Sequence, residues 1–202
     1  MDKLSQKHWI AFWIIIIFQI ISFAIATLGT IVTISNACLC LFLIHRYLQE
    51  PLSEYGVNFK NLHIQIISGF FLAYVFLFLT FNNTYSRPIQ FLIKHYSLRF
   101  SSLSHAFLFL LNILIYVIPE EIIFRGFFLS FFQKIFSSTL FCVFLSAFLF
   151  GIGHYPMGQN WNQVIFTSIF GIVFGYLRIK EPEKFTLFSL SLAHFIYNCF
   201  VL

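Results

Sequence analysis

The stretch Pro119-Glu120-Glu121-Ile122-Ile123-Phe124-Arg125-Gly126 places two carboxylates and one guanidinium inside one of the most apolar regions of the chain. Only 9% of the residues are Asp, Glu, Lys or Arg, so this clustering is not background. A charged side chain at bilayer depth costs roughly 2.5–3.5 kcal/mol on insertion scales, and three unpaired ones cost about 8–10 kcal/mol. Either the cluster has a function, or the stretch is a short loop with interfacial charges between two membrane helices.

Spacing separates the roles of the three charges. Glu121 and Arg125 are four residues apart and would share one face of a helix, which predicts an ion pair. Glu120 lies about 100° round the axis, so it is left to point into a cavity and exchange a proton. Pro119 fits the first turn of a helix or a kink in a longer one. Gly126 allows close helix approach.

The composition predicts a membrane protein. The chain of 202 residues is 59% hydrophobic and contains 31 Phe, and its mean hydropathy is +0.87. A soluble core cannot absorb that much apolar surface, so the predicted fold is all-α, a multi-pass transmembrane helical bundle. The net charge of +5 is modest and lies mainly between the apolar runs. We therefore expect the lipid bilayer as a partner and no nucleic acid.

The apolar runs predict about seven spans, within a range of six to eight. The run from Trp9 to Ile44 is too long for one span of about 20 residues, and we expect two spans that break near Thr27–Thr30. Its start also fits a cleavable signal peptide that ends near Ala24-Ile25-Ala26. The remaining runs are approximately His63–Phe81, Leu103–Phe136, Thr139–Gly153, Gln163–Leu177 and Phe185–Leu202.

The run from Leu103 to Phe136 holds the acidic motif in its middle. As a helix it would be about 50 Å long, which exceeds a bilayer core. Three alternatives follow: a long tilted helix, a helix kinked at Pro119, or two segments. The centre of the polar connection Asn82–Ser102 could lie as an interfacial helix. We divide the single membrane domain into N-terminal spans and polar loops, 1–101, and catalytic core helices, 102–202.

Smaller signals concern packing and orientation. Gly171 and Gly175, four residues apart, predict a small-xxx-small packing face. The cysteines fall in apolar runs as packing residues, and no zinc-site spacing occurs among them; they are Cys38, Cys40, Cys142 and Cys199. The distribution of Lys and Arg favours a cytosolic N-terminus and leaves the C-terminus open.

Further polar groups stand in the apolar helices of the C-terminal half. His154 ends one such helix, and His194 and Asn198 share a face of the last one. Alone, each is explained as an interfacial histidine or an interhelical hydrogen bond. Together with Glu120 they are expected to face the bundle interior and meet.

That set has the parts of a hydrolase: a general base for water, a histidine proton relay, and N–H donors for an oxyanion. The alternative is a zinc site of the His₂Glu type at Glu120, His154 and His194, although the H-E-x-x-H spacing is absent.

Three motifs in order carry a family resemblance: Glu120-Glu121-x-x-Phe124-Arg125-Gly126, Phe150-x-x-x-His154 and His194-x-x-x-Asn198. They resemble the CAAX protease and bacteriocin-processing (CPBP) family, also called the Abi or type II CAAX prenyl endopeptidase group. The resemblance covers about residues 105–202. Glu54-Tyr55-Gly56-Val57 also resembles the segment that precedes the core of this family.

The resemblance implies an intramembrane endopeptidase that hydrolyses a membrane-associated or C-terminally processed peptide or protein. It implies that Glu120 activates water with help from His154, and that His194 and Asn198 stabilise the oxyanion. Glu121 and Arg125 would support the site. No cofactor is expected, and zinc at Glu120, His154 and His194 remains the alternative.

Two other functions stay open. A non-enzymatic peptide-binding or immunity protein could use the same cavity. A proton-coupled transporter could use Glu120 and His154 as a relay, although repeated halves are absent from the sequence. In every case we expect an integral, multi-pass protein, in the cytoplasmic membrane if the source is bacterial.

Overall fold

The computed structural model describes residues 5–24, 29–81, 102–155 and 160–201. These residues form helices and short connections, and they contain no β-strand. The predicted all-α fold is therefore confirmed. The elements are α1 Gln6–Ala24, α2 Gly29–Phe42, η2 Leu43–Leu48, η3 Leu52–Tyr55, α3 Leu62–Phe81, α5 Leu103–Glu120, η4 Glu121–Phe128, α6 Leu129–Ile135, α7 Thr139–Ile152, α9 Trp161–Lys180 and α10 Leu187–Val201.

The helices are those of a multi-pass membrane protein. In the described residues, four stretches are long and apolar enough to cross a bilayer: Ile31–Leu48, Leu62–Thr80, Leu103–Ile135 and Trp161–Lys180. Three further apolar helices are shorter, at Gln6–Ser22, Thr139–Ile152 and Leu187–Val201. Four long and three short helices fall where the seven spans were predicted, so the multi-pass bundle is confirmed.

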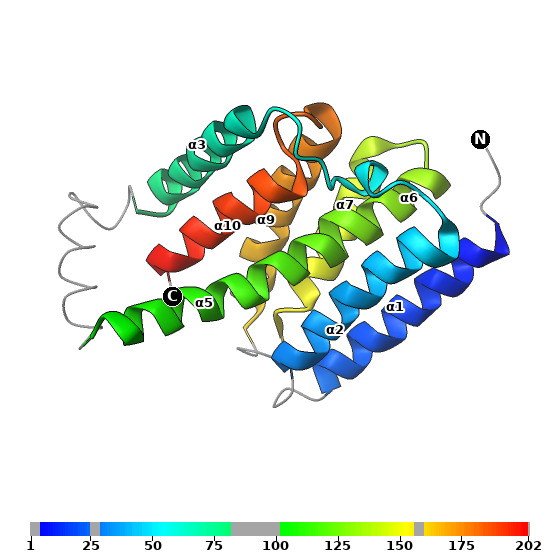
Figure 1. Ribbon diagram of the computed structural model, residues 1–202, viewed down its shortest axis with the longest axis horizontal. Helices are drawn as coiled ribbons and strands as arrows, with labels where there is room; N and C mark the ends of the chain where they lie inside the picture. The colour runs from blue at the N-terminus through cyan, green and yellow to red at the C-terminus, as the bar shows by residue number, and fades with distance from the viewer. Residues whose placement is uncertain (1–4, 25–28, 82–101, 156–159, 202) are drawn as a thin grey trace.

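One end of the bundle gathers the charged connections. The loops 49–61, 136–138 and 181–186 lie along the upper and right-hand margin of Figure 1, and α1 begins at this end. Lys60, Lys134, Lys180 and Lys184 belong to it. The helix α10 runs away from it and ends on the opposite side. The positive-inside rule therefore predicts that this end faces the cytosol and that α10 ends outside. Arg87, Lys94 and Arg99 lie outside the described residues, as does the predicted interfacial helix.

The first long apolar run forms two helices, as predicted. The helix α1 ends at Ala24 and α2 begins at Gly29, and the residues between them lie outside the described part. Buried polar side chains join the pair: Asn36 Nδ2 donates to Gln19 Oε1 at 2.8 Å. One turn away, the hydroxyls of Ser22 and Thr33 lie 3.3 Å apart. Such bonds between membrane helices contribute about 0.6 kcal/mol each.

The second long run is one continuous helical element made of α5, η4 and α6. Pro119 lies inside α5, and the next residues form the π-helical turn η4. A proline has no N–H to donate to the preceding turn, and the wider i→i+5 bonding of a π-helix absorbs such a defect without breaking the helix. The two-segment alternative and the interfacial-loop explanation are therefore wrong.

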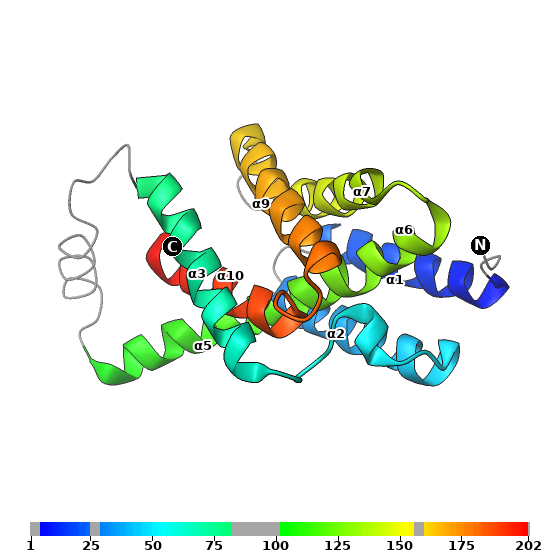
Figure 2. The same ribbon diagram turned by 90° about the horizontal axis from the view of Figure 1, so that it is seen from above.

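The element η4 lies at the centre of the bundle and contacts α2, α7, α9 and α10. Figure 2 shows α7 and α9 on one side of the long α5–α6 helix and α2 on the other. Seven of the eight residues of η4 are buried. A charge on η4 is thus surrounded by protein, which excludes lipid from it.

Close helix packing depends on two glycines of the α7–α9 pair. A Cβ at Gly151 would lie 1.9 Å from Ser168 Oγ and 2.7 Å from the Val164 carbonyl oxygen, and one at Gly171 would lie 2.9 Å from Ala147 Cβ. The predicted packing face is confirmed at Gly171. At Gly175 the nearest atom would be 3.4 Å away, so this glycine leaves room for a methyl group.

Candidate active site

Glu121 and Arg125 form the predicted ion pair. Arg125 Nη1 lies 3.2 Å from Glu121 Oε1, and the two side chains are only 1% and 0% exposed. The π-helical turn keeps both on one side of η4. Because a buried charge is tolerated only with a partner of opposite sign, the pair fixes both side chains in place.

Two aromatic rings enclose the guanidinium of Arg125. Its Cζ lies 3.9 Å from the centre of the Phe150 ring on α7 and 5.5 Å from that of Phe174 on α9. These cation–π contacts stabilise a desolvated cation. No role was predicted for either ring. Phe150 stood in the quoted motif four residues before His154, but no sequence signal marked Phe174.

His194 brings α10 to the two carboxylates. Its Nδ1 lies 2.9 Å from Glu121 Oε1, and its Nε2 lies 3.9 Å from Glu120 Oε2. A carboxylate oxygen accepts, so Nδ1 donates its proton to Glu121. One imidazole thus lies between the two carboxylates of the motif, and its Nε2 faces Glu120.

His154 reaches the same region from the end of α7. Its Nδ1 donates to the Phe150 carbonyl oxygen at 2.8 Å, which leaves Nε2 as the basic nitrogen. The centre of its ring lies 4.6 Å from that of the Phe150 ring, and the centre of the His194 ring lies 6.0 Å from that of the same ring. Among the described residues, no hydrogen bond or ion pair joins His154 to Glu120.

Asn198 follows His194 by one turn of α10 and is half-buried. Its side chain forms no hydrogen bond with another residue that the structure describes. Its predicted place beside His194 follows from the helix, and its predicted role remains untested.

Several buried polar atoms of the site lack a hydrogen-bond partner. They are Glu121 Oε2 and both terminal nitrogens of Arg125. Buried polar groups in native proteins are almost always satisfied by protein or by ordered water. Ordered water would supply the missing partners.

The donor set does not fit the zinc alternative as it stands. In the described residues, no three His, Cys, Asp or Glu side chains are grouped so that they could hold one metal ion. Nδ1 of His194 donates to Glu121 and Nδ1 of His154 donates to the Phe150 carbonyl, so only the Nε2 atoms of these rings could bind a metal ion.

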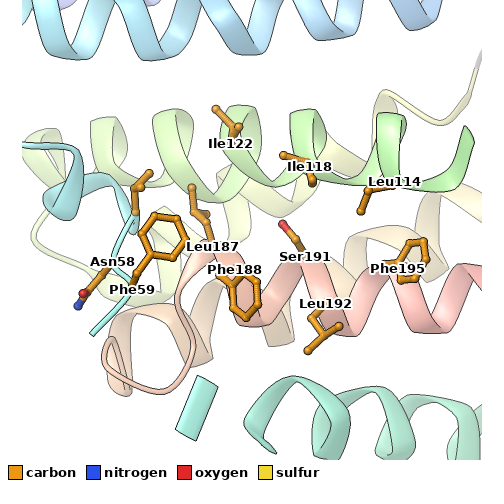
Figure 3. Close-up of a pocket in the computed structure, with 11 residues that line it drawn as sticks. Asn58, Phe59, Leu114, Ile118, Ile122, Leu187, Phe188, Ser191, Leu192 and Phe195 are labelled. Atoms are coloured by element: carbon orange, nitrogen blue, oxygen red, sulfur yellow. The ribbon is translucent and has the colours of Figure 1, made fainter. Parts of the chain in front are cut away.

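An apolar cavity of about 360 Å³ lies between the helices that carry the site. Its walls include Leu114, Ile118 and Ile122 on the motif helix and Leu187 and Phe195 on α10 (Figure 3). The loop residues Val57, Asn58 and Phe59 close one end. A cavity with such walls takes an apolar chain.

The loop that carries Glu54-Tyr55-Gly56-Val57 packs directly on the motif. A Cβ on Gly126 would lie 3.4 Å from the Tyr55 carbonyl oxygen. The Gly56 carbonyl accepts from the Leu187 N–H at 2.9 Å, where α10 begins. Gly56 has φ of 87°, and a Cβ there would lie 2.6 Å from Arg178 Nε. The loop therefore joins η4, α9 and α10 at the end of the bundle that holds the charged connections.

Comparison with known proteins gives one family. Residues 102–200 match the family model described as Type II CAAX prenyl endopeptidase Rce1-like. No curated protein and no solved structure matches the chain significantly. The matched residues contain all three motifs and every side chain of the candidate site. The match over residues 102–200 confirms the resemblance of the three motifs to the type II CAAX prenyl endopeptidase family.

Proposed function

We propose that this integral membrane protein is an intramembrane endopeptidase in which Glu120 activates the attacking water. The observation that carries the proposal is the unequal environment of the two adjacent glutamates. Glu121 is held by Arg125 and by His194 Nδ1. Glu120 is the carboxylate without such a partner, and it faces His194 Nε2 across 3.9 Å.

In the proposed reaction Glu120 accepts a proton from water, and the hydroxide attacks the carbonyl carbon of the scissile peptide. The oxyanion accepts hydrogen bonds from Asn198 Nδ2 and from Nε2–H of His194. Since Nδ1 of His194 donates to Glu121, that second N–H exists only when the ring carries both protons. Glu120 then passes its proton to the leaving amine, and the C–N bond breaks.

His154 is assigned to assist Glu120 through its Nε2. Its Nδ1–H is committed to the Phe150 carbonyl, so Nε2 is the atom that can accept and return a proton. A water between His154 and Glu120 would complete the relay.

The cavity between α5 and α10 would hold an apolar segment of the substrate. Its walls come from the same two helices as Glu120 and His194. A peptide that enters from the membrane can lie along this cavity and present one bond to the carboxylate. The substrate class is therefore a membrane-associated peptide or protein.

A reconstituted cleavage assay tests the proposal. Purified protein in lipid vesicles is given a library of membrane peptides, and new termini are identified by mass spectrometry. Glu120→Gln should reduce cleavage by at least about 10²-fold, because general-base catalysis contributes about 10²–10⁴-fold. Glu181→Gln, the same charge change in an exposed loop, should retain wild-type cleavage. Full activity of Glu120→Gln would exclude the proposed mechanism.

A peptide-binding membrane protein without enzymatic activity is the second candidate. The apolar cavity would suit a bound peptide as well as a cleaved one. In this case wild type and Glu120→Gln would bind the same peptides and neither would produce new termini.

A further inference from the structure

Arg178 is a second buried arginine, and its surroundings differ from those of Arg125. Its side chain is 6% exposed, and Nη2 donates to the Glu54 carbonyl oxygen at 3.1 Å and to Ser130 Oγ at 2.9 Å. Both partners are neutral, and Nε has no hydrogen-bond partner. Within the described part of the chain Arg178 forms no ion pair, whereas Arg125 has Glu121. A buried cation of this kind lacks the counter-charge that burial normally requires.

A polar cavity of about 280 Å³ adjoins Arg178. Three neutral hydrogen-bonding side chains line it: Ser53 and Asn58 on the loop, and Gln133 on α6. Two exposed carboxylates, Glu54 and Glu183, border the same cavity. The cavity therefore presents one buried cation, several neutral donors and two acidic groups at its rim.

The cavity lies where the apolar helices end. Arg178 stands in the last turn of the candidate span Trp161–Lys180, and Gln133 stands in the last turn of α6. The charged loop 181–186 and the loop 49–61 begin at this level (Figure 1). This is the depth at which phospholipid headgroups meet a membrane protein.

We propose that this cavity binds the headgroup of a zwitterionic phospholipid with a primary ammonium, phosphatidylethanolamine. The phosphate would accept from the guanidinium of Arg178 and from the Gln133 amide. The ammonium would donate to the carboxylates of Glu54 and Glu183. A purely anionic headgroup would place its charge beside those carboxylates without a cation of its own, and a choline headgroup has no N–H to donate to them.

Lipid binding at this place would act on the loop that packs against Gly126. Arg178 holds the Glu54 carbonyl, and the Tyr55 carbonyl lies against the motif. The proposal does not depend on the reaction assigned to Glu120, because it concerns binding alone.

Native mass spectrometry of the purified full-length chain in detergent tests the proposal. The protein is titrated separately with short-chain phosphatidylethanolamine, phosphatidylglycerol and phosphatidylcholine, and with inorganic phosphate. Wild type should bind phosphatidylethanolamine about tenfold more tightly than the other two lipids, since a charge-assisted hydrogen bond contributes a factor of this size.

Substitutions of exposed residues test the contacts to the ammonium and to the phosphate separately, without disturbing the core. Glu183→Gln should remove the preference for phosphatidylethanolamine, and Gln133→Leu should weaken the binding of all three lipids. Glu181 pairs with Lys184 at 3.1 Å and does not line the cavity. Glu181→Gln is therefore the matched control and should bind the lipids as wild type does. Arg178→Gln should lose the specific adduct, with thermal unfolding reporting whether that variant folds.

Several results would overturn the proposal. Equal affinities for the three lipids would do so, as would a Glu183→Gln variant that keeps the preference. Displacement of the lipid by inorganic phosphate at equal concentration would indicate a free-anion site. Displacement by a peptide with a free C-terminus would indicate a substrate-binding site.

Discussion

Glu120 and Glu121 are neighbours in the chain, but their surroundings differ. These surroundings suit Glu121 to a structural role and Glu120 to a chemical one. Glu121 is fully buried between Arg125 and His194, whereas the Glu120 side chain is 12% exposed. Spacing alone predicted that Arg125 would pair with Glu121. It could not predict His194 as the second partner of Glu121, because that contact depends on how α10 packs against η4.

Glu121→Gln should destabilise the protein much more than Glu120→Gln. The first substitution leaves Arg125 as an uncompensated buried charge, which costs about 3–5 kcal/mol. The measurement is thermal unfolding of both variants in the same detergent. Similar losses in the two variants would show that Glu121 does not have the structural role assigned to it.

Metal chelators should leave cleavage unchanged if Glu120 activates water by itself. The purified enzyme is treated with 1,10-phenanthroline, freed of chelator and assayed with and without added Zn²⁺. A loss of activity that Zn²⁺ restores would favour the zinc alternative at Glu120, His154 and His194, and would require a rearrangement of these side chains from the positions seen here.

Glu50, at the end of the bundle that holds the charged connections, should make the stability of the protein depend on pH. Burial acts to raise the pKa of Glu50, but hydrogen bonds from Lys134, Tyr55 and His8 outweigh it and hold the pKa below its ordinary value. A carboxyl group with a lowered folded-state pKa stabilises the protein above the unfolded pKa, about 4.3. This stabilisation is lost as the pH falls through the lower folded value.

Unfolding temperatures measured between pH 7 and pH 3 test this dependence. Wild type should lose stability below about pH 4.3, and Glu50→Gln should be less stable at pH 7 and show a smaller loss on acidification. Identical pH profiles for the two proteins would show that the ionised Glu50 carboxylate and its hydrogen bonds do not stabilise the fold.

At the scale of elements, the α7–α9 pair depends on the absence of a side chain at Gly151. Gly151→Ala should weaken the packing strongly, because its Cβ would lie within 2.7 Å of a backbone carbonyl that cannot move independently. Gly175→Ala, on the same helix pair with 3.4 Å of room, is the matched control. Unfolding temperatures in detergent measure both, and an equal tolerance of the two substitutions would contradict the packing described.

The sequence predicted the helical elements well because long apolar runs have few alternatives in a membrane. It did not predict the π-helical turn after Pro119, since a proline inside an apolar run fits a kink, a start or a break equally well. The structure removes the ambiguity because α2, α7, α9 and α10 surround η4 and keep it helical. Tertiary packing, which no local pattern reports, decided the conformation.

At the scale of the whole molecule, the site is built from helices far apart in sequence. Of the polar groups expected to meet in the membrane, Glu120 and His194 approach each other to 3.9 Å, and Glu121 is a further contact of His194. His154 and His194 both contact the Phe150 ring. Arg178 drew no attention in the sequence because an arginine near a helix end is ordinary, and only folding shows that it is buried beside a cavity.

The most direct measurement compares membrane and secreted peptides, by mass spectrometry, in cells that carry wild type or Glu120→Gln at matched expression. If Glu120 activates water, at least one peptide should have a terminus that appears with wild type and is absent with Glu120→Gln. Such a peptide would also identify the substrate. Identical peptide profiles, in cells where the variant still supports the phenotype of the wild type, would contradict the proposed protease activity and favour a peptide-binding protein.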